Sequence, residues 1–248
     1  MIFQIKSYLK FLSKSTNQHG VHSPFVFDLV TKCFYKKTPS ELVNKIKKYR
    51  EDLESNTTTI SVMDFGKGSR VFKTNKRPIY KIAKVAGISK KRSELLIRLT
   101  EYFNPRNILE IGTSLGIGTA SLAIGNKETN IISLEGCPNT AKIANEQLKK
   151  HNLTNATLKI GDFKETLEET LNKNTFDFIY FDGNHQKEPT ISYFEQCLKS
   201  AHNNSVFIFD DIHWSEEMNE AWEYIKKHPK VTVTINSYFW GFVFFRKE

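Results

Sequence analysis

The chain has 248 residues, and 39 % of them are hydrophobic, which is enough for one large domain or for one domain with an extension. No apolar stretch approaches the roughly 18 residues that cross a bilayer, and the opening MIFQIKSYLKFLSK has no small-residue cleavage site, so we expect neither a membrane span nor a secretory signal. This opening predicts a short amphipathic helix that packs on the protein. Three cysteines without metal-like spacing predict free thiols in a reducing cytoplasm.

The net charge of +9 is unevenly distributed along the chain. Residues 1–106 hold 22 Lys and Arg against 8 Asp and Glu, whereas residues 107–248 hold 14 against 19. A basic segment is compatible with a nucleic acid or an anionic substrate, and equally with a solvated surface. In NKIKKYRED and KKRSELL the charges stand at helical spacing beside apolar residues, which is typical of ordinary amphipathic helices.

The first 106 residues are expected to be mainly helical. SPFVFDLVTKCFYKK and TPSELVNKIKKYREDL begin with residues suited to a helix N-terminus, and SKKRSELLIRLTEYF predicts a helix that leads into the first strand of a sheet. The stretch VMDFGKGSR between them is interpreted as a turn or a substrate-side loop. We therefore predict a basic, mainly helical extension over residues 1–90, acting as a lid or substrate platform, and a catalytic domain over residues 91–248.

From Asn107 onward, short apolar runs alternate with longer helical ones. This alternation predicts an α/β fold with a parallel sheet covered on both faces. The last two apolar runs follow each other almost directly, which predicts an antiparallel pair that closes the sheet. The predicted strands are NILEIGT, NIISLEG, ATLKIGD, FDFIYFDG, SVFIFDD, VTVTINS and FWGFVFFRK.

The first of these strands ends in a glycine-rich turn, ILEIGTSLGIGTASLA, which places backbone N–H groups at a helix N-terminus where a ligand can bind. The dinucleotide pattern G-x-G-x-x-G is not completed in either frame. Residues Gly112 to Gly116 do read G-x-S-x-G, which would make Ser114 the nucleophile of an α/β-hydrolase. That nucleophile normally follows several strands, whereas the segment before this turn is mostly helical.

A nucleoside-bearing cofactor is the third interpretation of the turn. Glu110, Gly112, Ser114 and Gly116 form an acidic-x-Gly-x-small-x-Gly pattern, and the next strand ends in Glu135, whose carboxylate can accept both ribose hydroxyls. The third strand ends in GDF, which places a polar acceptor and an aromatic ring where an adenine would lie. Three successive strand ends thus supply three suitable contacts.

With these motifs in this order, the sequence resembles the class I S-adenosylmethionine-dependent methyltransferases, and most closely the catechol and caffeoyl-CoA O-methyltransferase-like group. The resemblance runs from about Lys91 to the end. It implies a Rossmann-like seven-stranded methyltransferase sheet, mostly parallel with an antiparallel last strand, and S-adenosyl-L-methionine as cofactor. The cofactor-binding residues that we infer are Glu110, Gly112, Ser114, Gly116, Gly118, Glu135, Gly136, Asp162, Phe163 and Asp182.

Three carboxylates follow the fourth and fifth strands: Asp182, Asp210 and Asp211. Because parallel strands end at one edge of the sheet, these side chains are expected to converge, and a divalent cation would offset their repulsion. In the resembled enzymes a magnesium-type ion is held at the matching positions, with Asn in place of Asp211. The alternative is structural, with Asp211 capping the next helix and Asp210 accepting backbone N–H groups.

His185 stands three residues after Asp182, where the resembled enzymes carry the lysine that deprotonates the acceptor. Histidine titrates near neutral pH, so His185 is the candidate base, with Asp182 beside it and His213 as a second candidate. The predicted function is metal-assisted O-methylation of a small hydroxylated molecule. Two alternatives are metal-independent methylation of an anionic or nucleic-acid substrate and a non-catalytic nucleic-acid-binding module with a weak helix-turn-helix likeness over residues 82–96. A homodimer is a further expectation.

Overall fold

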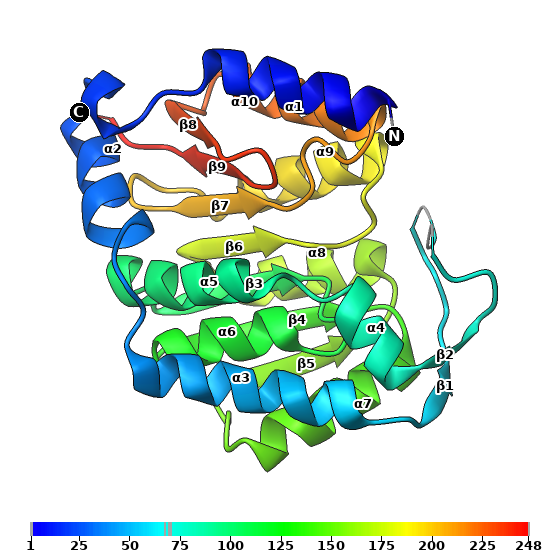
Figure 1. The fold of residues 1–248 in the computed structure, drawn as a ribbon. Coiled ribbons are helices and arrows are strands. Elements are labelled where there is room, and N and C mark those ends of the chain that lie inside the picture. The colour runs from blue at the N-terminus through cyan, green and yellow to red at the C-terminus, as the bar shows by residue number, and fades with distance from the viewer. Residues whose placement is uncertain (1, 67, 69–70, 248) are drawn as a thin grey trace.

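A seven-stranded sheet forms the centre of the computed structural model, which describes residues 2–66, 68 and 71–247. The strand order is β5-β4-β3-β6-β7-β9-β8, and β9 runs antiparallel to both of its neighbours (Figure 1). The predicted mostly parallel sheet with a reversed last strand is therefore confirmed. The strands are β3 (Asn107–Ile111), β4 (Asn130–Glu135), β5 (Ala156–Ile160), β6 (Phe178–Phe181), β7 (Val206–Phe209), β8 (Val233–Asn236) and β9 (Gly241–Phe244).

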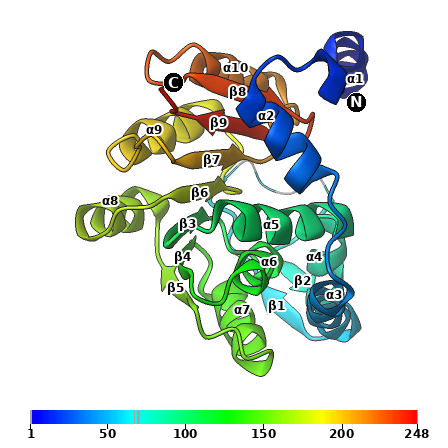
Figure 2. The same ribbon diagram turned by 90° about the vertical axis from the view of Figure 1, so that its left-hand side faces the viewer.

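Helices cover both faces of the sheet, and each face has its own hydrophobic core (Figure 2). Side chains from α2 to α7 share the first core, and side chains from α8, α9 and α10 share the second. The helices that follow the strands or lead into them are α5 (Lys90–Phe103), α6 (Ile117–Gly125), α7 (Pro138–Lys150), α8 (Phe163–Lys173), α9 (Lys187–Cys197) and α10 (Glu216–Lys226).

The two cores follow from the period-two alternation of side chains along each strand. In β6, Phe178 and Tyr180 point into the first core, while Ile179 and Phe181 point into the second. The neighbouring β7 alternates in the same register, because Phe178 pairs with Val206 and Phe181 pairs with Phe209. Both strands are buried along their whole length, so their apolar residues run without interruption until the sheet edge.

The N-terminal part of the chain precedes α5, and its helices from α2 to α4 pack onto the first core. It comprises α1 (Ile2–Lys14), a 3-10 turn (Gln18–Gly20), α2 (Pro24–Leu29), a π-helical turn (Val30–Phe34), α3 (Ser40–Ser55) and α4 (Ile79–Val85). A short antiparallel hairpin of β1 (Thr59–Ser61) and β2 (Lys76–Pro78) lies between α3 and α4. The sequence did not predict this hairpin, because three-residue strands are too short to show an alternating pattern.

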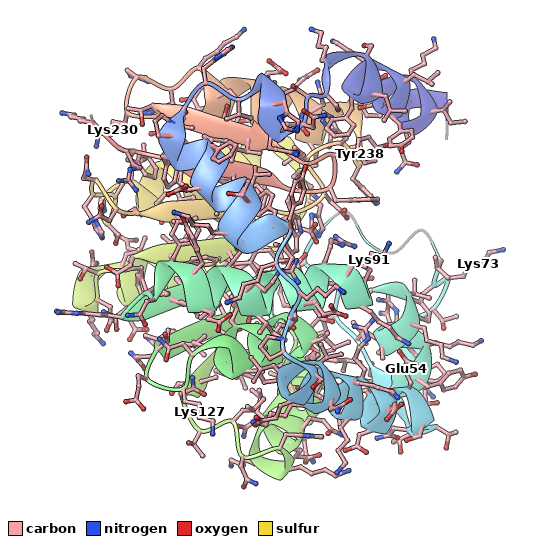
Figure 3. The ribbon with its side chains drawn as sticks, turned by 60° about the vertical axis from the view of Figure 1, so that its left-hand side comes forward. Glu54, Lys73, Lys91, Lys127, Lys230 and Tyr238 are labelled. Carbon is pink, nitrogen blue, oxygen red and sulfur yellow. The ribbon has the colours of Figure 1, made fainter. Side chains whose placement is uncertain are left out.

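Helix α1 lies against the turn between β8 and β9 (Figure 3). The Tyr238 hydroxyl in that turn donates a hydrogen bond to the carbonyl oxygen of Gln4 over 3.0 Å, and the Tyr238 ring packs edge-on against Tyr8. Across the described residues, no helix has both the length and the apolar character that a bilayer crossing requires. The three cysteines are free and buried.

Candidate active site

Two aspartates become neighbours because of the register between β6 and β7. The strands pair up to Phe181 and Phe209, so the next residues, Asp182 and Asp210, stand side by side at the carboxyl edge of the sheet. The Asp210 N–H donates to the carbonyl oxygen of Phe181 over 2.9 Å, which extends the pairing into this position. By the period of two, both side chains fall on the face of the sheet that carries α5.

A cavity of about 640 Å³ opens at this edge. Its walls come from the ends of the parallel strands, from the loop between β1 and β2, and from the segment between α4 and α5. Ten of the predicted site residues line it: Gly112, Ser114, Glu135, Gly136, Asp162, Phe163, Asp182, His185, Asp210 and Asp211. Glu110, Gly116 and Gly118 lie outside its lining.

The glycine turn holds its shape through backbone conformations that favour glycine. Gly112 has φ +107°, and a Cβ atom there would clash with the carbonyl oxygen of Asp182. Gly116, with φ +77°, begins α6, and a Cβ would lie 2.6 Å from the Tyr49 hydroxyl. These close approaches bring β3, β6 and α3 together around the turn.

Glu135, at the end of β4, is tied directly to this turn. Its Oε2 accepts the Ser114 N–H over 2.6 Å, and its Oε1 accepts the Cys137 N–H over 2.9 Å. Burial raises the pKa of the Glu135 carboxyl, and these hydrogen bonds oppose the rise. At most one of the four acceptor positions of the carboxylate is left, because the Thr140 hydroxyl takes a third.

Glu110 is fully buried beneath the turn rather than in the cavity. Its Oε2 accepts hydrogen bonds from the hydroxyls of Thr119 and Ser133, whereas its Oε1 has no partner among the described residues. Burial raises the pKa of Glu110 to about 7. The geometry gives Glu110 a supporting position between β3, β4 and α6.

At the end of β5, Asp162 and Phe163 stand at the cavity wall. Asp162 is exposed and caps α8 by accepting the Lys164 N–H over 2.9 Å. The Phe163 ring packs edge-on against Tyr193, with a centroid separation of 6.0 Å, and fits against Gly183. An acceptor and an aromatic ring are thus adjacent in the cavity.

The Asp182 and Asp210 carboxylates form the acid cluster of the site together with Asp211. Burial and the neighbouring Asp210 carboxylate raise the pKa of Asp182 well above its usual value, and the Arg92 cation opposes this rise. The Tyr180 hydroxyl donates to Asp182 Oδ2 over 3.3 Å. Asp211 has φ +54°, and its N–H donates to Asp210 Oδ1 over 2.9 Å. The cap of the following helix α10 is Ser215, not Asp211.

Arg92 in the first turn of α5 reaches this cluster. Its Nη1 donates to Asp210 Oδ1 over 2.7 Å, and its guanidinium carbon lies 5.1 Å from the centre of the Phe239 ring. Burial lowers the pKa of Arg92, but the surrounding carboxylates Asp210, Asp211 and Asp182 raise it to a net value above the usual one. Arg92 also lines the cavity.

His185 faces Asp182 across 3.7 Å between Nε2 and Oδ1, and its ring lies 6.2 Å from that of Trp214. Asn184 and His185 both have positive φ angles, as do Ser114 and Asp211. Left-handed backbone at residues other than glycine is costly and concentrates at functional sites. His213 lies outside the cavity lining and is held by Asn219 and Asn236.

Sequence reasoning missed several residues of the site. Arg92 and Tyr49 come from helices that precede the sheet, and no motif marks them. Phe65 covers Gly136, and the Asp64 carboxylate pairs with Arg77 at the cavity wall. The sequence does carry a signal for the pairing of Asp182 with Asp210, because each of them directly follows the last apolar residue of a buried strand. The Ser114 hydroxyl has no histidine partner among the described residues.

A family model described as a methyltransferase domain matches residues 109–212. A catechol O-methyltransferase of Mycobacterium tuberculosis (strain ATCC 25618 / H37Rv) is 27 % identical over 127 residues, which cover 50 % of this chain and 56 % of that protein. The chain thus matches little more than half the length of this curated relative.

Two solved structures share the fold. An SAH-bound methyltransferase of Podospora anserina has a TM-score of 0.63 and 15 % identity, and the match covers 92 % of this chain and 97 % of that one. An O-methyltransferase of Bacillus cereus in complex with SAH has a TM-score of 0.57 and 21 % identity, over 89 % and 97 % of the two chains. The predicted resemblance to the class I S-adenosylmethionine-dependent methyltransferases of the catechol and caffeoyl-CoA O-methyltransferase type is therefore confirmed, since residues 109–212 match a methyltransferase domain and the chain is similar to catechol O-methyltransferases.

Proposed function

We propose that this chain transfers a methyl group from S-adenosyl-L-methionine to a hydroxyl oxygen of a small molecule. The observation that carries the proposal is a cavity of about 640 Å³ whose lining combines cofactor-type contacts with acid–base groups. That volume is in the range of small-molecule sites. Catechol, which the names of two relatives mention, is a reasonable first acceptor to test.

The cavity offers suitable contacts for both the ribose and the adenine of the cofactor. Glu135 lines the cavity and has one acceptor position left for a ribose hydroxyl, and Asp162 and Phe163 offer an acceptor and a ring for an adenine. Gly112 lets the turn lie against the backbone of Asp182, which keeps both residues at the cavity wall. When bound, S-adenosyl-L-methionine supplies an electrophilic methyl group on a sulfonium.

The groups at the other end of the cavity suit proton removal from the acceptor. We assign the base to His185, whose Nε2 lies 3.7 Å from Asp182 Oδ1. The acceptor oxygen gives its proton to His185 as it forms its bond to the methyl carbon. Trp214 forms part of the adjacent wall. Much of the acceleration comes from holding the reactants in line.

Nothing observed among the described residues of the cavity supports the predicted divalent cation, because the carboxylates of the acid cluster are arranged in a way that does not suit metal binding. One oxygen of Asp210 already accepts hydrogen bonds from Arg92 and from the Asp211 N–H. In the described part of the chain, no three His, Cys, Asp or Glu side chains are grouped so that they could hold a metal ion. We therefore derive no step through a metal.

For the N-terminal residues 1–90 we propose the role of a substrate platform. Residues of the loop between β1 and β2, and of the segment from Ile82 to Ile88, line the cavity opposite the strand ends. Tyr49 of α3 braces the glycine turn. The basic character of this segment suits an acceptor that carries negative charge.

Calorimetric titration with S-adenosyl-L-methionine tests the cofactor part of the proposal. The wild type is expected to bind, and Glu135→Ala to bind about 10- to 100-fold more weakly, because a charge-assisted hydrogen bond to the ribose is lost. Glu128→Ala is the matched control, since Glu128 is exposed and far from the cavity lining. A wild type that binds no S-adenosyl-L-methionine would overturn the proposed function.

The acceptor is found by incubating the wild type with S-adenosyl-L-methionine and a panel of hydroxylated compounds that begins with catechol. Mass spectrometry of the products is expected to show a gain of one methyl group on oxygen. Methylation of nitrogen, or of a nucleic acid in the same panel, would contradict the proposed acceptor class.

A further inference from the structure

The acid cluster already contains a positive charge that belongs to the chain. Arg92 Nη1 lies 2.7 Å from Asp210 Oδ1, and the two side chains are 23 % and 5 % exposed. An ion pair this sheltered from water is screened far less than one on the surface. The position is therefore a fixed charge in the site rather than a surface contact.

The fold delivers Arg92 to this point through its sheet register and a helix cap. Ser89 caps α5 by accepting the Arg92 N–H, which begins the helix at the carboxyl edge of the sheet. Asp182 and Asp210 point to the same face of the sheet as α5, so the arginine pairs with Asp210 and feels the charge of Asp182. The Phe239 ring on the other side holds the guanidinium in place.

The guanidinium has hydrogen-bonding capacity left over. It carries five N–H donors in a planar fork, and the bond to Asp210 uses one of them. No other hydrogen bond joins the Arg92 side chain to the described residues, and the side chain lines the cavity. The remaining donors are thus available to an oxygen of a bound molecule.

We propose that Arg92 acts as the cation of the acid cluster: it neutralises Asp210 and donates hydrogen bonds to the acceptor oxygen, so that methyl transfer needs no divalent metal. This inference rests on the proposed function and names the group that stabilises the acceptor. An arginine is suited to this task, because it stays charged throughout and binds anionic oxygens through a fixed fork.

In the reaction, the acceptor O–H bond breaks and its proton goes to His185. The oxygen lone pair forms the new bond to the methyl carbon as the carbon–sulfur bond breaks, and sulfur keeps that electron pair. Arg92 stabilises the negative charge on the oxygen while the proton leaves. No electron donor or acceptor is required.

A divalent ion and Arg92 compete for the same oxygens. Magnesium requires near-octahedral ligation by oxygen atoms, so it would need the Asp210 oxygen that Arg92 occupies. Displacing the guanidinium from Asp210 would leave the part-buried Arg92 cation without its partner, which is costly. Losing Arg92 is therefore expected to free the cluster for a metal ion. This exchange can be measured without any turnover.

The decisive experiment is a Mn²⁺ titration followed by electron paramagnetic resonance, with Mn²⁺ itself as the probe. The wild type is expected to show no stoichiometric site, and Arg92→Met to gain one site at least about tenfold tighter. Lys91→Met is the matched control, because it removes a neighbouring exposed lysine on the same helix (Figure 3) and should behave as the wild type. The double variant Arg92→Met/Asp210→Asn should lose the gained site.

Turnover in the presence of EDTA gives the second readout. The wild type is expected to remain active, and Arg92→Met to lose about 10- to 100-fold of its kcat, because a charge-assisted hydrogen bond is removed. Arg92→Lys keeps the positive charge and should therefore bind no Mn²⁺. It replaces Arg92→Met in the assays if Arg92→Met does not fold. S-adenosyl-L-methionine affinity should stay within about twofold in every folded variant, so a failure of cofactor binding is distinguished from a failure of this inference.

A wild type that binds one Mn²⁺ tightly, loses it on Asp182→Asn and stops turning over in EDTA would overturn the inference while leaving the methyltransferase intact. An Arg92→Met variant with unchanged kcat and no Mn²⁺ site would overturn it as well.

Discussion

The hydroxyl of Tyr49 donates a hydrogen bond of 3.0 Å to the carbonyl oxygen of Leu115, and this bond joins helix α3 to the glycine turn of the proposed cofactor site. Tyr49 is fully buried, and its hydroxyl lies where a side chain on Gly116 would begin. An N-terminal helix thus helps to fix the turn that we propose binds the cofactor.

Tyr49→Phe removes this bond and leaves the Leu115 carbonyl without a partner. The free energy of unfolding is expected to fall by about 1 to 3 kcal/mol, and S-adenosyl-L-methionine to bind more weakly. Urea unfolding and calorimetry measure the two effects. Tyr35→Phe is the control, since Tyr35 is 58 % exposed. Equal behaviour of the two variants would show that the bond is unimportant.

Gly112→Ala is expected to destabilise the protein by several kcal/mol and to abolish cofactor binding. The new methyl group would clash with the backbone of Asp182, at φ +107°, and backbone cannot move aside cheaply. Gly68→Ala is a matched comparison, because Gly68 also has positive φ but open space around its Cβ position. It should cost only about 1 kcal/mol. Similar losses at both positions would contradict the role given to the close approach.

Glu110 makes stability depend on pH. Its pKa is raised from 4.5 to about 7 by burial, so between these values the folded chain holds a proton that the unfolded chain has released. Stability from this group is therefore highest below about pH 4.5 and is lost as pH rises to about 7, by about 3 kcal/mol in total.

Glu110→Gln removes this titration. The difference in unfolding free energy between variant and wild type, measured by urea unfolding at pH 5 and pH 8, should shift by about 3 kcal/mol in favour of the variant at the higher pH. Taking the difference cancels the other titrating groups. A difference that does not change with pH would show that Glu110 keeps one protonation state over this range.

His185→Asn is expected to lower kcat by about 10²- to 10⁴-fold and to leave S-adenosyl-L-methionine affinity unchanged, because only proton removal is lost. The acceptor identified in the product screen serves for the assay. His202→Asn is the control, since His202 also lies beside an aspartate, at 3.1 Å from Asp177, but outside the cavity lining. An unchanged kcat in His185→Asn would move the base to another group.

The sheet and its strand ends could be predicted from sequence because they depend on local patterns. The apolar runs up to Phe181 and Phe209 mark buried parallel strands, and the residues directly after such strands must lie at one edge. Arg92 could not be predicted in this way. Its contact with Asp210 depends on how α5 crosses the sheet, and nothing in KKRSELL distinguishes it from the lysines beside it.

The same limit applies to the carboxylates. Sequence spacing brings Asp182, Asp210 and Asp211 to one edge, but whether they form a metal site depends on which groups share the space. An arginine 118 positions earlier in the chain pairs with one of them. Charge balance in a site is a tertiary property, and short motifs do not record it.

Strand β9 is synthesised after both of the strands that it pairs with in the sheet. Gly241–Phe244 pair with β7 on one side and with β8 on the other, so both of those edges stay open until the last strand has been made. Phe239, which holds Arg92, arrives at the same late moment. A chain stopped before this strand would therefore carry two exposed strand edges prone to association with other chains, and an Arg92 side chain without the Phe239 ring beside it.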